Sequence, residues 1–321
     1  MRWISKKFSA VALDPVHIGT GGERLGRVDL SVVREPVTKV PKIPGTTLSG
    51  AMKFFLDLKL RDKNIKHDIC ASTRGSSRQH NWAECPVCFA FGYTPQLDKK
   101  GAKTKINPQS AQGVLQFTDA SLLAYPIPTI TGPVWLTTKT RVKEILGLGD
   151  GIDAPGESWL MPEGSVVNPL TETRLNLGWV LLDKGDSDCP AVSEITASGI
   201  DEKYGKNFIV VAEWIFSYLV NNNMEIRTSV VIDPETGAAA SQGLFTYEAV
   251  ARGAIFGVEI IENDFMQGWQ KVDWNTGIAP KPGDTIDMIS DYALDGIKSV
   301  GLGGMTTRGF GRLAFTELNG S

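Results

Sequence analysis

The sequence predicts an α+β fold, in which a split β-α-β sheet carries helices on one face. Strand-like and helix-like segments are interleaved along the 321 residues. Turn-rich segments in the C-terminal part favour hairpins, which pair strands antiparallel. A hydrophobic content of 42% with 21% charged residues is typical of a globular chain. We therefore expect one elaborated domain over residues 1–321, with insertions.

The first predicted elements are a strand and a helix. Residues 8–14 (FSAVALD) alternate well enough for a strand, and a glycine-rich loop runs from Gly19 to Gly26. We next expect a helix that Thr46 or Thr47 caps through its side-chain oxygen. At helical spacing, its buried face holds Leu48, Ala51, Met52, Phe55 and Leu58, whereas Ser49, Lys53 and Asp57 face outward.

Residues 62–112 are polar, bear cysteines and lack periodicity, so we interpret them as an insertion held by something other than an apolar core. A histidine-cysteine pair and a cysteine-cysteine pair in this segment each have two residues between their members. Together they suit a structural zinc ion with three thiolates and one imidazole. The predicted ligands are His67, Cys70, Cys85 and Cys88, with His80 as the alternative fourth ligand. A redox C-x-x-C is the other interpretation, but no thioredoxin-like pattern surrounds it. Cys189 is expected to be an inert core or loop residue.

The remaining elements follow from apolar patterns and turn residues. Strands are predicted over 113–125 and 175–183, and a buried helix over 207–220. Strands over 224–233 and 243–250 flank a turn at 233–237, and a further strand over 253–262 adds a second hairpin connection. A last helix over 283–296 leads through a glycine loop into a terminal strand.

Charge limits the partners that the chain can have. The net charge of −3 and a pI near 5.7 exclude a protein that coats nucleic acid by bulk charge, so any RNA contact must be local. The apolar run after the basic start breaks at Asp14-Pro15, too early for a signal peptide. No stretch approaches the roughly 18 apolar residues of a membrane span, so we expect a cytoplasmic protein without a membrane partner.

A second glycine loop lies near the C-terminus. It holds Gly301, Gly303, Gly304, Gly309 and Gly311, interleaved with Thr306, Thr307, Arg308 and Arg312. Backbone N–H groups in such a loop can approach phosphates closely, and hydroxyl and guanidinium groups add hydrogen bonds. The spacing matches neither a dinucleotide fingerprint nor a P-loop. A tight connection across a sheet edge is the plainer alternative.

Residues 17–53 (HIGTGGERLGRVDLSVVREPVTKVPKIPGTTLSGAMK) resemble the N-terminal signature of the backbone RAMP proteins of type III CRISPR effector complexes. The resemblance continues through CPVCFAFG, FTDASLLAYP, IDPETG, GLFTYEAV and GLGGMTTRGFGRL, in family order and over nearly the whole chain. It is closest to the backbone subunit of the Cmr complex and next to that of the Csm complex.

The resemblance implies an RRM-like, ferredoxin-like core with hairpin extensions, and a subunit that lines up with copies of itself along a guide CRISPR RNA. Its other implied partners are the target RNA and further type III subunits, including the large subunit. It makes Asp29 the catalytic residue of a target-RNA endoribonuclease that uses Mg²⁺ or another divalent metal. The implied guide contacts are Thr46, Thr47, Ser49 and Lys53 of the first helix, and Gly303, Gly304, Met305, Thr306, Thr307 and Arg308 of the glycine loop.

Several points stay open at this level. Ser49 stands where the family usually has lysine, which weakens the expected helix contact. His17 is expected to support the loop or contact RNA rather than to catalyse. The sequence does not place the family's thumb hairpin.

Asp29 near arginines could be an ordinary surface ion pair, but RNA brings its own 2′-hydroxyl nucleophile, so one carboxylate suffices for the chemistry. A purely structural guide-binding subunit and a repeat-processing ribonuclease are the alternatives. The last would need histidine pairs, and only His17 is in reach.

Overall fold

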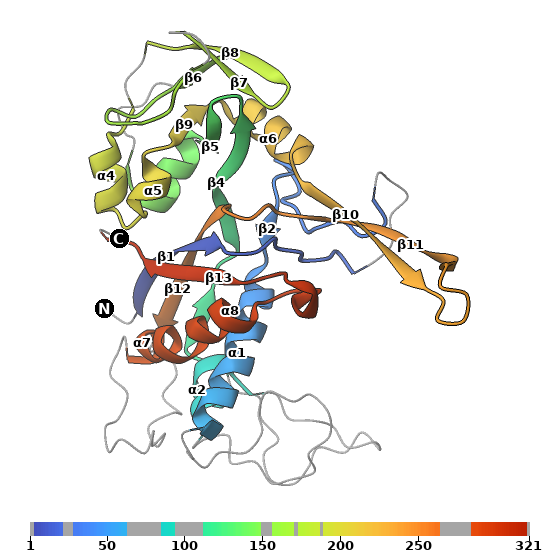
Figure 1. The fold of residues 1–321 in the computed structure, drawn as a ribbon. Helices are drawn as coiled ribbons and strands as arrows, with labels where there is room; N and C mark the ends of the chain where they lie inside the picture. Colours follow the sequence, from blue (N-terminus) through green and yellow to red (C-terminus); the bar gives the residue numbers. More distant parts are fainter. Residues whose placement is uncertain are drawn as a thin grey trace. The chain divides into compact units, whose positions relative to one another are not determined.

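The structure is a computed structural model, which describes residues 3–21, 28–62, 85–93, 112–148, 156–169, 173–186, 189–263 and 284–319. Backbone contacts divide the chain into two compact units. Figure 1 shows the fold, coloured from blue at the N-terminus to red at the C-terminus. The first unit comprises Met1–Lys6, Gly45–Thr118 and Glu259–Ser299, and the second comprises Lys7–Pro44, Asp119–Val258 and Val300–Ser321.

A large mixed sheet organises the second unit. Its order is β13 (Leu313–Glu317), β1 (Trp3–Ala12), β12 (Ile255–Asn263), β4 (Ala120–Thr129), β5 (Gly132–Thr137), β9 (Phe208–Val211), β6 (Ser158–Leu160), β8 (Val180–Lys184) and β7 (Arg174–Leu177). The short β2 (Lys42–Ile43) also pairs with β4. Pairing is antiparallel for β1–β13, β4–β5 and β7–β8 but parallel for β5–β9 and β6–β8. The predicted mixture of helices and strands around a sheet is confirmed.

Helices and strands of the second unit enclose an apolar core around β4 and β9. It includes Leu123, Val142, Ile195, Phe208 and Ile255. The helical segments are α3 (Lys139–Arg141), η2 (Val142–Leu146), α4 (Val192–Ala197), α5 (Glu202–Gly205) and α6 (Glu213–Asn222). The predicted helix over 207–220 is therefore wrong in its first part. Residues 208–211 are consecutive buried apolar residues, three of them β-branched, and fit a fully buried strand better than a helix.

The single strand predicted over 175–183 is a hairpin. Strand β7 ends at Leu177 and β8 begins at Val180, in antiparallel register Leu177↔Val180. The turn needs a residue with positive φ, and Gly178 supplies it at +58°. The strand predicted over 113–125 is also divided, into β3 (Leu115–Phe117) and β4.

The predicted hairpin around residues 233–237 is confirmed. Strands β10 (Glu225–Ile232) and β11 (Ala239–Ala249) pair antiparallel, and we call this hairpin the arm. Figure 1 shows the arm, in orange, extending from the rest of its unit. The second predicted hairpin connection is wrong, because β12 pairs with β4 rather than with β11. After β11 the chain leaves the arm through a bridge between Val250 and Val16.

The first unit is helical around a short strand pair. It holds α1 (Gly45–Asp62), α2 (Pro86–Phe91), the pairing of β3 with the end of β12, α7 (Asp284–Ile289), η4 (Ser290–Leu294) and most of α8 (Asp295–Val300). Helix α1 packs against η4 and α2. Gly296 lies against Phe55, where a Cβ would stand 2.4 Å from the ring. The helical segment near the C-terminus is confirmed.

The buried stripe of α1 differs from the prediction. The helix begins at Gly45, so Thr46 and Thr47 lie in its first turn rather than at its cap. Leu56 and Leu60 are buried, whereas Leu58 is 38% exposed and Asp57 only 1%. Positions four apart (48, 52, 56, 60) advance slowly around a helix, so the stripe turns toward Asp57 and away from Leu58.

Within the expected insertion, the structure describes residues 85–93. Helix α2 buries five successive side chains, Pro86–Ala90, and packs on α1. This part is thus held by apolar burial, contrary to the expectation of a segment without a core. Across the described part of the chain, no helix combines the length and apolar content that a membrane span needs.

Candidate functional site

Asp29 lies against strand β11 of the arm, and Thr246 forms hydrogen bonds with its side chain. The backbone N–H of Thr246 donates to Asp29 Oδ2 at 2.6 Å, and the Thr246 hydroxyl donates to the same oxygen at 2.9 Å. Leu30 forms a parallel bridge with Tyr247, which fixes the backbone beside the carboxylate. The amide and hydroxyl of Thr246 lower the pKa of Asp29 below its ordinary value of 3.8. Asp29 is therefore an exposed carboxylate that stays ionised at neutral pH.

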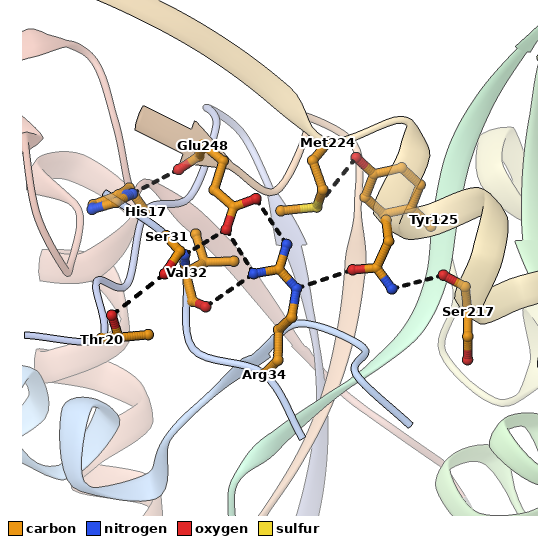
Figure 2. A network of polar contacts seen from close by, with 10 residues as sticks. His17, Thr20, Ser31, Val32, Arg34, Tyr125, Ser217, Met224 and Glu248 are labelled. Carbon is orange, nitrogen blue, oxygen red and sulfur yellow. Dashed lines mark hydrogen bonds and ion pairs between the residues drawn. The ribbon is translucent and has the colours of Figure 1, made fainter. Parts of the chain in front are cut away.

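A partly buried ion pair anchors the same segment two residues further along β11. Arg34 binds the Glu248 carboxylate with two hydrogen bonds, of 2.6 and 2.8 Å. The Val32 amide also donates to Glu248 Oε1 at 2.8 Å. Burial opposes ionisation of Glu248, but the Arg34 and Val32 donors prevail and its pKa is lowered. Figure 2 shows this pair at the centre of a network of polar contacts.

The network extends from Arg34 to helix α6. Arg34 Nε donates to Asn221 Oδ1 at 3.0 Å, and Asn221 Nδ2 donates to the Ser217 carbonyl oxygen at 2.8 Å (Figure 2). Arg34 thus joins residues 28–34, strand β11 and α6, so the backbone that carries Asp29 is braced on two sides.

His17 is a buried support for both glycine loops. Its Nδ1–H donates to the Glu248 carbonyl oxygen at 2.6 Å, and its side chain is 5% exposed. The Gly304 amide donates to the His17 carbonyl oxygen at 2.9 Å. A Cβ at Gly19 or Gly304 would stand only 3.2 or 3.1 Å from the imidazole, so the ring packs between the two loops. This position agrees with loop support, the first of the two roles predicted for His17.

The C-terminal glycine loop lies beside the arm in this unit. Gly301, Gly303, Gly309 and Gly311 all have positive φ, and Met305 shares that conformation at +64°. A side chain at position 303 is excluded for a second reason, since a Cβ there would stand 2.5 Å from Ile18 and 2.7 Å from the His17 carbonyl oxygen. The loop therefore holds its bend through glycine, with Thr307 and Arg308 exposed.

Aromatic rings join this loop to the arm and to the Asp29 segment. Tyr247 and Phe310 are in edge contact at 5.7 Å, and Leu30, Phe245 and Met305 pack on them. Two guanidinium groups stack on the cluster, Arg227 over Phe310 at 4.7 Å and Arg308 over Phe245 at 5.9 Å. Arg227 Nε also donates to Glu225 Oε1 at 2.6 Å, so part of its N–H edge is already engaged. Arg308 is exposed, and a cation over a ring can still bind a phosphate through its N–H groups.

The structure therefore brings Asp29, His17 and the loop residues Gly303, Gly304, Met305, Thr306, Thr307 and Arg308 into one neighbourhood. The predicted helix contacts belong to the first unit. There Thr46 is exposed, and Thr47, Ser49 and Lys53 are partly exposed. Gly22, Gly26 and Arg27 lie outside the described residues.

The structure describes only some of the predicted zinc ligands. Cys85 and Cys88 are buried at the start of α2, whereas His67, Cys70 and the alternative His80 lie outside the described residues. Among described residues, no three His, Cys, Asp or Glu side chains gather as a metal site would require. Cys189 packs against the core of the second unit, in keeping with its predicted structural role.

The sequence patterns did not indicate four residues of the site, Arg34, Asn221, Thr246 and Glu248. Thr246 and Glu248 alternate with Tyr247 and Ala249, which places two polar side chains on one face of a largely apolar strand end. That alternation is the signal that could have found them. Their partners stand more than 180 positions away in sequence.

Comparison with known proteins places this geometry in a family. The model of the RAMP superfamily matches residues 10–314. The CRISPR system Cmr endoribonuclease Cmr4 of Pyrococcus furiosus is 23% identical over 261 residues, which cover 76% of this chain and 77% of that protein. The CRISPR system Cms endoribonuclease Csm3 of Methanothermobacter thermautotrophicus is 27% identical over 92 residues, 28% of this chain and 33% of that protein. The latter match therefore spans only about a third of the relative.

Solved structures share the fold over nearly the full length. A chain of the type III-B Cmr-beta complex bound to cognate target RNA matches with a TM-score of 0.64 and 17% identity, covering 98% of this chain and 97% of that one. Oligomeric Cmr4 from Pyrococcus furiosus matches with a TM-score of 0.59 and 15% identity, covering 99% of this chain and all of that one.

Proposed function

The chain belongs to the RAMP superfamily, and on that premise we propose that it is a guide-RNA-binding backbone subunit of a type III CRISPR effector complex that cuts target RNA at regular intervals. Its relatives support the class, since one is a Cmr endoribonuclease and another a Csm3 endoribonuclease. The fold shared with a chain of a target-RNA-bound Cmr-beta complex supports an RNA-binding role.

The observation that carries the proposal is the state of Asp29. It is exposed and ionised, and its backbone is bridged to an arm that also carries stacked cations. An ordinary surface aspartate pairs with a cation, whereas Asp29, among the described residues, forms its hydrogen bonds with Thr246. Both hydrogen bonds that Thr246 donates to the Asp29 carboxylate go to Oδ2, and neither goes to Oδ1.

The chemistry that Asp29 would serve is transesterification within RNA. The 2′-oxygen attacks the adjacent phosphorus as its proton passes to water, and the 5′-oxygen of the next nucleotide leaves and takes up a proton from water. The products are a 2′,3′-cyclic phosphate and a 5′-hydroxyl end. Since the pKa of Asp29 is lowered, its carboxylate is a weak proton acceptor, which favours an electrostatic role over general-base catalysis.

A divalent metal such as Mg²⁺ fits this carboxylate. Mg²⁺ is commonly held by one or two carboxylates together with substrate phosphates and water, and Asp29 offers an ionised oxygen atom on an exposed side chain. Asp29 would hold the ion, which would supply positive charge to the phosphate. For Zn²⁺, the buried Cys85 and Cys88 would provide two sulfur ligands at C-x-x-C spacing, and we propose that His67 and Cys70 complete the site.

Guide RNA would contact the exposed part of the glycine loop and the stacked guanidinium of Arg308. Local contacts of this kind are what a chain with a net charge of −3 requires. Thr46, Thr47, Ser49 and Lys53 are proposed to add contacts from α1, and the arm is our candidate for the family's thumb hairpin. The other proposed partners are target RNA, further copies of this chain and the other type III subunits, in the cytoplasm.

The class is tested by purifying a tagged chain from its host under native conditions. We expect guide RNA with a repeat-derived 5′ sequence and a type III large subunit to co-purify. Arg308→Ala should retain less RNA than the wild type. If neither RNA nor other subunits accompany the wild-type chain, the proposal is wrong.

A further inference from the structure

We propose that Thr246 is a positioning residue for the cleavage reaction, which sets the orientation of the Asp29 carboxylate. The inference rests on the proposed function of Asp29 in cutting RNA.

The contacts between the two residues run in both directions. The Thr246 amide and hydroxyl donate to Asp29 Oδ2, while the Asp29 amide lies 3.2 Å from the Thr246 hydroxyl oxygen. The Leu30 amide donates to the Thr246 carbonyl oxygen at 3.1 Å. An exposed aspartate would otherwise rotate among several side-chain conformations. Both donors converge on Oδ2, so they select one orientation of the carboxylate.

The strand that carries Thr246 is itself fixed. Glu248 lies two positions along β11, and it is held by Arg34 and by the Val32 amide. The Glu248 amide also donates to the Leu30 carbonyl oxygen at 3.1 Å. The hydrogen bonds of the Leu30 amide and carbonyl groups therefore fix the position of Thr246 relative to Asp29.

The arm supplies a matched control. Thr228 on β10 stands directly opposite Thr246 in the antiparallel register, so both side chains lie on one face of the hairpin. Thr228 is exposed, and the hydrogen bonds that hold Asp29 come from Thr246 instead. The same substitution at positions 246 and 228 thus separates the loss of this hydroxyl from a general effect on the arm.

The experiment compares Thr246→Val, Thr246→Ser, Thr228→Val and Asp29→Asn in assembled complexes with guide RNA. Misplacement of a reacting group by about 1 Å can cost roughly 100-fold, so at saturating target and Mg²⁺ we expect Thr246→Val to cut about 10- to 100-fold more slowly. Target binding should be unchanged. Thr246→Ser keeps the hydroxyl and should restore most of the rate, and Thr228→Val should behave as wild type.

A second measurement reads Asp29 directly. In the isolated chain, ¹³C NMR titration of the Asp29 carboxyl, assigned with Asp29→Asn, should show its pKa moving up toward the ordinary value in Thr246→Val. Thr228→Val should leave it in place. The titration tests whether Thr246 holds the Asp29 carboxylate, and the cutting rate tests whether that contact matters for cleavage.

The outcomes distinguish the inference from its premise. If Asp29→Asn abolishes cutting while Thr246→Val cuts at the wild-type rate, Thr246 has no positioning role, whatever the titration shows, and the proposed function stands. If Asp29→Asn cuts like wild type, the proposed function of Asp29 fails instead.

Discussion

The guanidinium of Arg34 and the carboxylate of Glu248 form a two-bond ion pair of 2.6 and 2.8 Å across 214 positions of sequence. The Glu248 side chain is 9% exposed and that of Arg34 21%. Removal of one partner leaves a buried charge without compensation, which is far more costly than the loss of a surface pair. This ion pair therefore helps to hold the segment that carries Asp29 against β11.

We expect Arg34→Ala to lower the free energy of unfolding by about 2–4 kcal/mol, because Glu248 stays buried and charged. Chemical denaturation measures the change. The matched control is Arg174→Ala, whose ion pair with Asp183 is more than half exposed on both sides and should cost about 0–1 kcal/mol. Equal losses in the two variants would show that the Arg34 pair is an ordinary surface contact.

The same pair predicts a pH dependence of stability. The pKa of Glu248 is lowered in the folded chain relative to its ordinary value of 4.5. The ionised form is therefore favoured by folding, and its contribution is complete above pH 4.5 and lost as the pH falls through the lowered pKa. Thermal unfolding between about pH 3 and 7 should show a smaller loss at the acid end for Glu248→Gln than for wild type. Parallel curves would contradict this account.

The sequence predicted the elements at the two ends of the chain and the arm, but none of β5, β6, α3, α4 and α5. Its errors elsewhere have physical causes. Residues 208–211 looked like the start of a helix because they run into an amphipathic helical stretch, yet three β-branched residues in a row prefer the sheet. The turn at Gly178 was missed because a glycine inside an apolar run reads as part of the strand. Pairing partners, such as β12 with β4, depend on contacts that local pattern does not encode.

The sequence predicted those residues of the candidate site that lie in short continuous motifs. Asp29, His17 and the glycine loop follow from motif blocks, and the structure brings them together. The residues that hold them, Thr246 and Glu248, are defined by tertiary contacts to a segment more than 200 positions away. A single sequence carries no record of such pairs.

Zinc is expected at about one ion per chain, with Cys85 and Cys88 among the ligands. Cys85→Ser should lose the metal and destabilise the segment around α2, as measured by elemental analysis and limited proteolysis. Cys189→Ser is the matched control, since Cys189 packs against the core of the other unit. His67→Ala compared with His80→Ala identifies the fourth ligand. A stable wild-type chain without zinc would remove the hypothesis.

Guide RNA retention should depend on a few cations. Arg308→Ala or Lys53→Ala is expected to weaken binding of every guide sequence alike, and to reduce the slope of log affinity against log salt by about 0.7 for each phosphate that is no longer neutralised. Lys203→Ala is a fitting control, because this exposed cation is also stacked, 4.7 Å above Tyr204, on α5. Filter binding at several salt concentrations measures the effect. Base-dependent losses would argue against backbone recognition.

The most direct test of the account is target cleavage by complexes assembled with Asp29→Asn. A neutral amide at this position can still accept from Thr246 but carries no charge for a metal or a developing transition state. We expect assembly and target binding as in wild type, with regularly spaced, metal-dependent cuts abolished, whereas Asp183→Asn should cut normally. Cleavage by Asp29→Asn at the wild-type rate and spacing would contradict the central claim.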